Sequence, residues 1–189
     1  MHLKVAEILS VYIESGDADY IGEPVSQLSH MLQAAYFAQE SGADSELILA
    51  AFFHDIGHLC ADKDAEQMSE LGVLNHELVG AQFVLDRGCS RRVSELVAGH
   101  VQAKRYLCWS KTSYLNKLSQ ASRQTLEFQG GPMNETEARM FEQSPYFKDI
   151  LRLRIWDERA KIPNGPELSL EQLSKLLEYH IEHRGKDAT

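Results

Sequence analysis

The sequence predicts an all-α fold, and three observations support this prediction. Apolar residues recur every three or four positions along most of the chain, which is the period of a helix that buries one face. Glycines, prolines and capping residues interrupt this pattern at spacings typical of helix lengths. No stretch alternates apolar and polar residues with comparable strength, as a half-buried strand would. We therefore expect a helical bundle.

Local signals mark the ends of the expected helices. Asp44, Asn75 and Ser90 each precede a new apolar repeat and are suited to accept hydrogen bonds from the first free amides of a helix. Asn134 opens a sequence with the form of a capping box, and Pro145 fits the first position of a further helix. The chain from residue 60 to 72 lacks an apolar period and is expected to be a surface loop. The expected helices span residues 3–14, 25–40, 45–58, 76–87, 91–109, 112–118, 119–128, 134–143, 145–161 and 170–183.

Length and composition narrow the class of protein. The 189 residues fit one domain, which we place at residues 1–189. A net charge of -9 without a Lys/Arg cluster argues against a nucleic-acid partner. No apolar run reaches the roughly 18 residues of a membrane span, so no membrane partner is expected. The three cysteines lie far apart without metal-binding or disulfide spacing, which indicates a reducing cytoplasm. The oligomeric state is left open.

Two histidines and an aspartate enter an apolar helix between Ala50 and His58. Continuing the helical spacing from Asp44 places His54, Asp55 and His58 on or beside the buried face. A buried aspartate without a partner is destabilising by on the order of several kcal/mol, so it requires neutralisation or a metal ion. One carboxylate can bridge two ions, and each imidazole supplies one nitrogen. The adjacent His54 and Asp55 therefore indicate a dinuclear metal centre.

Further residues of metal-ligand type lie on the other expected helices. A single helical histidine is more often a core or surface residue than a ligand, and the chain has eight histidines. Six histidines and aspartates taken together favour a metal site, because five of them lie beside apolar neighbours and the sixth follows a tryptophan. His2, His180 and His183 lack that setting and are expected at the surface. The candidate ligands are His30, His54, Asp55, His76, His100 and Asp157.

The order of these residues resembles that of the HD-domain metal-dependent hydrolases, and the two histidines after the His-Asp pair mark members that bind two metals. From about residue 19 to 161, the chain is also similar to the diiron HD-domain oxygenases that cleave organophosphonates. The stretches that carry this similarity are Asp19-Tyr20-Ile21-Gly22-Glu23, Ser26-Gln27-Leu28, Gly99-His100-Val101, Ala103-Lys104-Arg105-Tyr106-Leu107, Gln129-Gly130-Gly131-Pro132-Met133 and Arg154-Ile155-Trp156-Asp157.

The resemblance implies two iron ions in a mixed-valent Fe(II)/Fe(III) state, with dioxygen as co-substrate. Asp55 would bridge the ions and form the catalytic pair with His54. Nitrogen and carboxylate ligands without thiolate suit iron or manganese, so the residue types alone do not select the metal. The implied ligands are His30, His54, Asp55 and Asp157 for one ion and Asp55, His76 and His100 for the other.

The implied reaction is cleavage of the carbon–phosphorus bond of a small-molecule hydroxyphosphonate, with 2-amino-1-hydroxyethylphosphonate converted to glycine and phosphate. Lys104 lies one turn after His100 and therefore on the same helix face. Arg154 lies three residues before Asp157, and its guanidinium can bind a phosphonate through two nitrogens. The resemblance assigns phosphonate binding to His58, Lys104, Ser122 and Arg154.

The resemblance also implies that Tyr20 and Glu23 lie over the site, where the tyrosine occupies the iron before substrate arrives and the glutamate accepts the substrate's ammonium group. A carboxylate accepts hydrogen bonds from a primary ammonium but not from a trimethylammonium, so Glu23 favours the aminated substrate. Two alternatives stay open: an HD-type metal-dependent phosphohydrolase, and an oxygenase acting on the trimethylammonium analogue. A non-catalytic metal-binding regulator is a third class, which open coordination positions disfavour.

Overall fold

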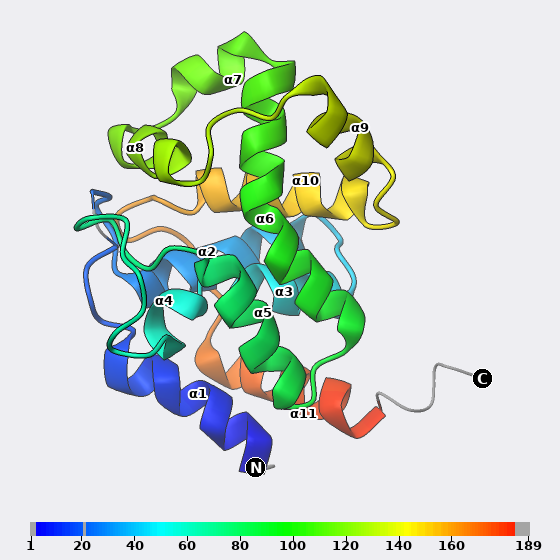
Figure 1. The fold of residues 1–189 in the computed structure, drawn as a ribbon. Helices are drawn as coiled ribbons and strands as arrows, with labels where there is room; N and C mark the ends of the chain where they lie inside the picture. Colours follow the sequence, from blue (N-terminus) through cyan, green and yellow to red (C-terminus); the bar gives the residue numbers. More distant parts are fainter. Residues whose placement is uncertain (1–2, 21, 184–189) are drawn as a thin grey trace.

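The structure is a computed structural model that describes residues 3–20 and 22–183, and these form helices joined by loops (Figure 1). Over those residues, β-type pairing is limited to two isolated bridges, Asp19 with Ser26 and Gln67 with Val73. The predicted all-α fold is confirmed. The helices are α1 Leu3–Ser15, α2 Gln27–Glu40, α3 Ser45–Phe53, α4 Gly57–Cys60, α5 His76–Asp86, α6 Arg91–Ser110, α7 Thr112–Lys117, α8 Gln120–Phe128, α9 Glu135–Glu142, α10 Phe147–Arg159 and α11 Leu170–His183.

The long helix α6 runs through the middle of the molecule (Figure 1). Helices α3, α5 and α10 contact it, and α2 packs against α3 and α10. Helices α7, α8 and α9 gather around the C-terminal half of α6, while α1 and α11 lie together at the opposite end. Every residue from Leu47 to Phe53 is buried, so α3 is the centre of the apolar core. Among the described residues, no helix is long and apolar enough to cross a membrane.

Several predicted caps are present. The Asp44 side chain accepts a hydrogen bond from the Leu47 amide at 3.1 Å, and the Ser90 side chain accepts one from the Val93 amide at 3.1 Å. Asn134 forms the predicted capping box with Glu137. The Asn134 side chain accepts a hydrogen bond from the Glu137 amide, and the Glu137 side chain accepts one from the Asn134 amide. These bonds satisfy amides that a helix leaves free at its start, and they fix where α3, α6 and α9 begin.

Two predicted helix starts were wrong in detail. Asn75 precedes α5 but has a left-handed backbone with φ 58°, and its side chain makes no capping bond. Asparagine tolerates this conformation, which turns its side chain away from the first amides of the helix. Pro145 lies before α10 rather than in its first position, because the chain makes a turn there in which the Phe147 amide donates to the Ser144 carbonyl at 3.1 Å.

The helix predicted to continue through His58 is interrupted. Helix α3 ends at Phe53, and a turn of three residues leads into α4. The Ile56 amide donates to the Phe53 carbonyl at 3.0 Å, and the His58 amide donates to the Asp55 carbonyl at 3.0 Å. Hydrogen bonds over three residues wind the chain more tightly than an α-helix does. The prediction of an unbroken helix was therefore wrong, and His54 and Asp55 lie in the turn.

The chain approaches α5 closely at Gly57, the residue after this turn. A Cβ atom on Gly57 would lie 1.9 Å from the carbonyl oxygen of His76, so only glycine fits here without moving a backbone. Since His76 begins α5, this contact sets how closely that helix approaches the turn that carries Asp55.

We expect Gly57→Ala to lower the free energy of unfolding by about 3 kcal/mol, because the added methyl group must push α5 away. Denaturant unfolding measures this loss. Gly42→Ala is the control: an added Cβ there meets no atom within 4 Å, and its φ of +69° leaves only a strain of about 1 kcal/mol. Equal losses in the two variants would contradict the role given to the Gly57 contact.

Candidate metal centre

Four buried histidines from four different parts of the chain meet at the centre of the bundle. Each is at most 4% exposed, and each has its Nδ1 atom within hydrogen-bond distance of a backbone carbonyl oxygen, at 2.8 to 3.1 Å. A neutral histidine whose Nδ1–H donates to a carbonyl keeps a lone pair on Nε2, so these bonds orient four lone pairs toward one place. The pairs are His30 with Ala160, His54 with Ala51, His76 with Val73 and His100 with Val97.

The four Nε2 atoms form two close pairs. The Nε2 atoms of His30 and His54 are 3.0 Å apart, and those of His76 and His100 are 3.1 Å apart. Two lone pairs at this distance repel each other unless a positive charge lies beside them. Each pair therefore requires a proton or a metal ion.

The two oxygens of the Asp55 carboxylate face different histidine pairs. Its Oδ2 atom lies 3.5 Å from His30 Nε2 and 3.4 Å from His54 Nε2. Its Oδ1 atom lies 3.3 Å from the Nε2 atoms of both His76 and His100. Each carboxylate oxygen thus faces one histidine pair, which is the arrangement in which one carboxylate bridges two ions.

Asp157 of α10 joins the first pair through one oxygen. Its Oδ1 atom lies 3.4 Å from His30 Nε2 and 3.9 Å from His54 Nε2, and this buried atom has no hydrogen-bond partner among the described residues. Its Oδ2 atom accepts a hydrogen bond from the guanidinium of Arg154. A buried carboxylate oxygen without a partner is destabilising, and a metal ion at the first pair would satisfy it.

The electrostatics of the site call for added positive charge. Burial by itself would raise the pKa of Asp55, but the nearby His54, His100 and His30 hold it well below its usual range. Burial likewise would raise the pKa of Asp157, which Arg154 and His30 lower strongly. Burial lowers the pKa of His30, yet the nearby carboxylates of Asp157 and Asp55 outweigh it and raise the value to about 9. Two ionised carboxylates thus draw a cation into the site, either a proton or a metal ion.

The residues present fit two metal ions. Metal bonds of about 2.1 Å at right angles place neighbouring ligand atoms about 3.0 Å apart, and the closest ligand atoms here lie at 3.0 and 3.1 Å. Imidazole and carboxylate ligands without thiolate suit iron or manganese. The two possible ligand groups are His30, His54, Asp55 and Asp157, and Asp55, His76 and His100.

His58 lies close to Asp55 and His76 but has the opposite hydrogen-bonding pattern to the four histidines. Its Nδ1 atom accepts a hydrogen bond from the Val73 amide at 3.1 Å, and burial together with the nearby His76 holds its pKa well below the usual range. A neutral histidine that accepts at Nδ1 carries its proton on Nε2. His58, whose ring stacks on that of His76 at 3.9 Å, is therefore a hydrogen-bond donor to the site rather than a ligand.

A pocket opens onto the centre, and all six predicted substrate residues line it. These six residues are Tyr20, Glu23, His58, Lys104, Ser122 and Arg154. The pocket is also lined by Asp55, His76, His100 and Asp157. His30 and His54 lie deeper, with no exposed surface. The sequence-predicted residues, which span most of the chain, therefore converge on one cavity.

The pocket has two buried cations. Lys104 is 4% exposed and donates to Thr125 Oγ1 at 2.9 Å, and burial, with a contribution from nearby Arg154, lowers its pKa to about 7. Arg154 is also 4% exposed and donates from Nε to the hydroxyl of Tyr114 at 2.8 Å. Both basic side chains line the same pocket, which makes it suited to binding an anion.

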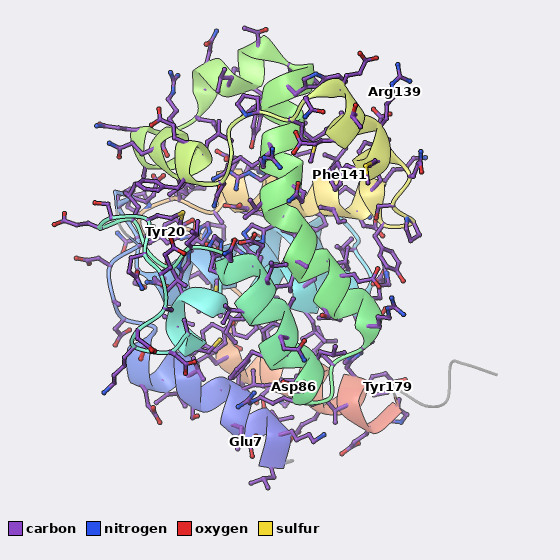
Figure 2. The ribbon with its side chains drawn as sticks, viewed as in Figure 1. Glu7, Tyr20, Asp86, Arg139, Phe141 and Tyr179 are labelled. Carbon is purple, nitrogen blue, oxygen red and sulfur yellow. The ribbon has the colours of Figure 1, made fainter. Side chains whose placement is uncertain are left out.

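Tyr20 lines the pocket, and Figure 2 labels it at the left of the bundle. Its ring stacks on that of His30, with centroids 4.1 Å apart and planes at 14°. Burial raises its pKa well above the usual value, and so do the charges of Asp55 and Asp157. Tyr20 therefore stays a neutral phenol whose ring covers that of His30.

Comparison with known proteins agrees with this architecture. The HD domain matches residues 28–137. A hydroxymethylphosphonate dioxygenase of Gimesia maris is 39% identical over 181 residues, 95% of this chain and 89% of that protein. A glycine-betaine-forming dioxygenase of 1-hydroxy-2-(trimethylamino)ethylphosphonate from Leisingera caerulea is 40% identical over 151 residues, 80% of this chain and 76% of that protein. The chain belongs to the HD-domain oxygenase family. An uncharacterized protein of Acanthamoeba polyphaga mimivirus is 42% identical over 159 residues, 84% of this chain and 73% of that protein.

The loop from residue 60 to 72 in this HD-domain oxygenase is more than the surface loop that the sequence predicted. Its Met68 is 1% exposed, and Met68, Leu71 and Gly72 line the pocket. Their spacing has no helical period, so no sequence signal identified them. Thr125 was missed as well, although it lies one turn after Ser122 on α8 and could have been found from that spacing.

The expectation for His180 was wrong. This residue of α11 is 8% exposed, and its Nε2 atom accepts a hydrogen bond from the Ser90 amide at 3.0 Å. Its charged and polar neighbours in sequence concealed a contact that only tertiary packing creates. His183 is half-buried at the end of α11, and His2 lies outside the described residues.

Removing single ligands should change the metal content of this oxygenase in steps. We expect Asp55→Ala to lose both metal ions, because both histidine pairs lose their shared carboxylate, and His76→Ala to lose one ion. The measurement is metal per chain by plasma mass spectrometry after loading with Fe(II) and desalting. His183→Ala serves as the control, because this histidine is far from the pocket lining, and it should keep both ions. Full metal content in Asp55→Ala would contradict the bridging role.

Proposed function

We propose that this oxygenase cleaves the carbon–phosphorus bond of a 1-hydroxyphosphonate, converting 2-amino-1-hydroxyethylphosphonate and dioxygen to glycine and phosphate. The atoms of substrate and one dioxygen equal those of the two products. The observation that carries the proposal is the Asp55 carboxylate, whose two oxygens face two histidine pairs beside a pocket that contains Lys104 and Arg154. The names of two relatives, both phosphonate dioxygenases, support the reaction class.

The proposed metal ligands are the six residues of the centre. One ion would be held by His30, His54, Asp55 and Asp157, and the other by Asp55, His76 and His100. When bound, a mixed-valent pair of iron ions supplies one-electron chemistry with dioxygen. These seven protein bonds would leave positions on two six-coordinate ions for substrate and dioxygen, and the Tyr20 ring stacks on the ligand candidate His30.

We assign the phosphonate to the cationic end of the pocket. Lys104 and Arg154 would neutralise its charge, while the Nε2–H of His58 and the hydroxyl of Ser122 would donate to its oxygens. The anion would also stabilise the ammonium form of Lys104, which burial disfavours in the empty pocket. Arg154 contacts Asp157 as well, so the guanidinium would connect the phosphonate to a metal ligand.

Glu23 supports the aminated substrate within this class. It lines the pocket, and its carboxylate can accept hydrogen bonds from a primary ammonium. The Leisingera caerulea relative is named for a trimethylammonium substrate, which has no N–H to donate, and the Gimesia maris relative for one with no amine at all. The same reaction on the trimethylammonium analogue is therefore the second candidate.

The decisive test is oxygen consumption by iron-loaded protein given 2-amino-1-hydroxyethylphosphonate, with glycine and phosphate quantified. We expect one dioxygen to disappear for each phosphate released. The trimethylammonium analogue and hydroxymethylphosphonate, assayed in parallel, rank the substrates. Release of phosphate from phosphate esters without oxygen uptake, and none from the phosphonates, would identify a phosphohydrolase and overturn the proposal.

The phosphonate assignment predicts that Lys104→Ala keeps its metal but raises KM about tenfold or more, because hydrogen bonds to charged groups contribute about 1.5–3 kcal/mol. The measurement is steady-state oxygen uptake at several substrate concentrations. Lys117→Ala removes an exposed lysine of α7 and should leave KM unchanged. A metal-replete Lys104→Ala protein with normal KM would remove Lys104 from the phosphonate site.

A further inference from the structure

Glu23 has an ion-pair partner within the protein itself. Its Oε1 atom accepts a hydrogen bond from Lys161 Nζ at 2.8 Å and another from Ser119 Oγ at 2.6 Å. The side chain of Glu23 is 9% exposed and that of Lys161 is 12% exposed, so this pair is shielded from water. The carboxylate that would accept a substrate ammonium is thus already bound to a lysine ammonium.

Lys161 reaches Glu23 from outside the pocket. It follows Ala160, the residue after α10 whose carbonyl oxygen lies 2.8 Å from His30 Nδ1. Glu23 belongs to the residues that line the pocket, whereas Lys161 does not. Lys161 also contacts one of the residues assigned to the phosphonate, with its Nζ 3.3 Å from Ser122 Oγ. The ammonium of Lys161 therefore pairs with Glu23 and lies close to Ser122 without lining the pocket itself.

We propose that Lys161 is a specificity-determining residue, whose ammonium competes with the ammonium of the substrate for Glu23. This inference rests on the proposed function. An aminated substrate forms an ion pair with Glu23 only when its ammonium displaces Lys161 or shares the carboxylate with it. A substrate without an amine leaves the Glu23–Lys161 pair intact, so this competition does not weaken its binding. Lys161 thus narrows the preference for aminated over non-aminated hydroxyphosphonates.

The pair also holds the segment that carries Tyr20. The Glu23 amide donates to the Tyr20 carbonyl at 2.9 Å, and Lys161 Nζ lies 6.0 Å from the centre of the Tyr20 ring. An amine that draws Glu23 away from Lys161 would therefore move this turn. A substrate without an amine offers no such pull, so the competition at Glu23 acts on amine-bearing substrates alone.

The test compares Lys161→Met with wild-type protein on 2-amino-1-hydroxyethylphosphonate and hydroxymethylphosphonate. Iron-loaded protein is used without oxygen for dissociation constants by calorimetry, and with oxygen for kcat/KM. We expect Lys161→Met to bind the aminated substrate about fivefold more tightly, because the competing ion pair is gone, and hydroxymethylphosphonate as before. Lys161→Arg retains the charge and should keep the wild-type ratio. Lys148→Met, an exposed lysine of α10, is the control.

Other results overturn the inference. Weaker binding of both substrates by Lys161→Met would make Lys161 a phosphonate contact acting through Ser122, and an unchanged ratio would make the pair structural only. If wild-type protein bound and turned over neither phosphonate, the proposed function itself would fail, and this inference with it. Activity on phosphonates with an unchanged ratio would leave the proposed function standing and remove only the role of Lys161.

Discussion

The structure depends on one buried negative charge, the carboxylate of Asp55. Each of its oxygens faces a pair of imidazole nitrogens, and those nitrogens present lone pairs because the opposite ring nitrogens donate to backbone carbonyls. Neither the carboxylate nor the lone-pair contacts are stable in a buried core without positive charge. The requirement for cations is therefore part of the fold itself rather than a property added at its surface.

The helices are arranged to satisfy this requirement. His54 and Asp55 lie in the tight turn after α3, where His54 keeps helical backbone angles, and both side chains reach the same centre. Gly57 then lets α5 approach closely enough to bring His76 to the opposite oxygen. The apolar core around α3 supplies the rigidity, since closely packed interiors hold side chains in fixed positions.

The pocket beside the centre separates two kinds of charge. Lys104 and Arg154 gather on the side of α6 and α10, where an anion would bind, while Glu23 reaches in from the turn that carries Tyr20. The protein as a whole has a net charge of -9, so Lys104 and Arg154 are the residues that would attract the anionic substrate of the proposed function. The two charged ends of the proposed aminated substrate would thus be matched by residues on separate elements of the fold.

The sequence by itself determined the helical class, the caps at Asp44 and Ser90, and the residues that meet at the centre, because helical periodicity reports which side chains face the core. Polar residues on that buried face had to be satisfied, and this led to the candidate metal ligands. The pairing of Glu23 with Lys161, the burial of His180 and the entry of the 60–72 loop into the pocket were decided only by the tertiary structure. Each of these joins residues that are far apart in the chain or that follow no helical period, so periodicity shows that a side chain is buried but not which partner it meets.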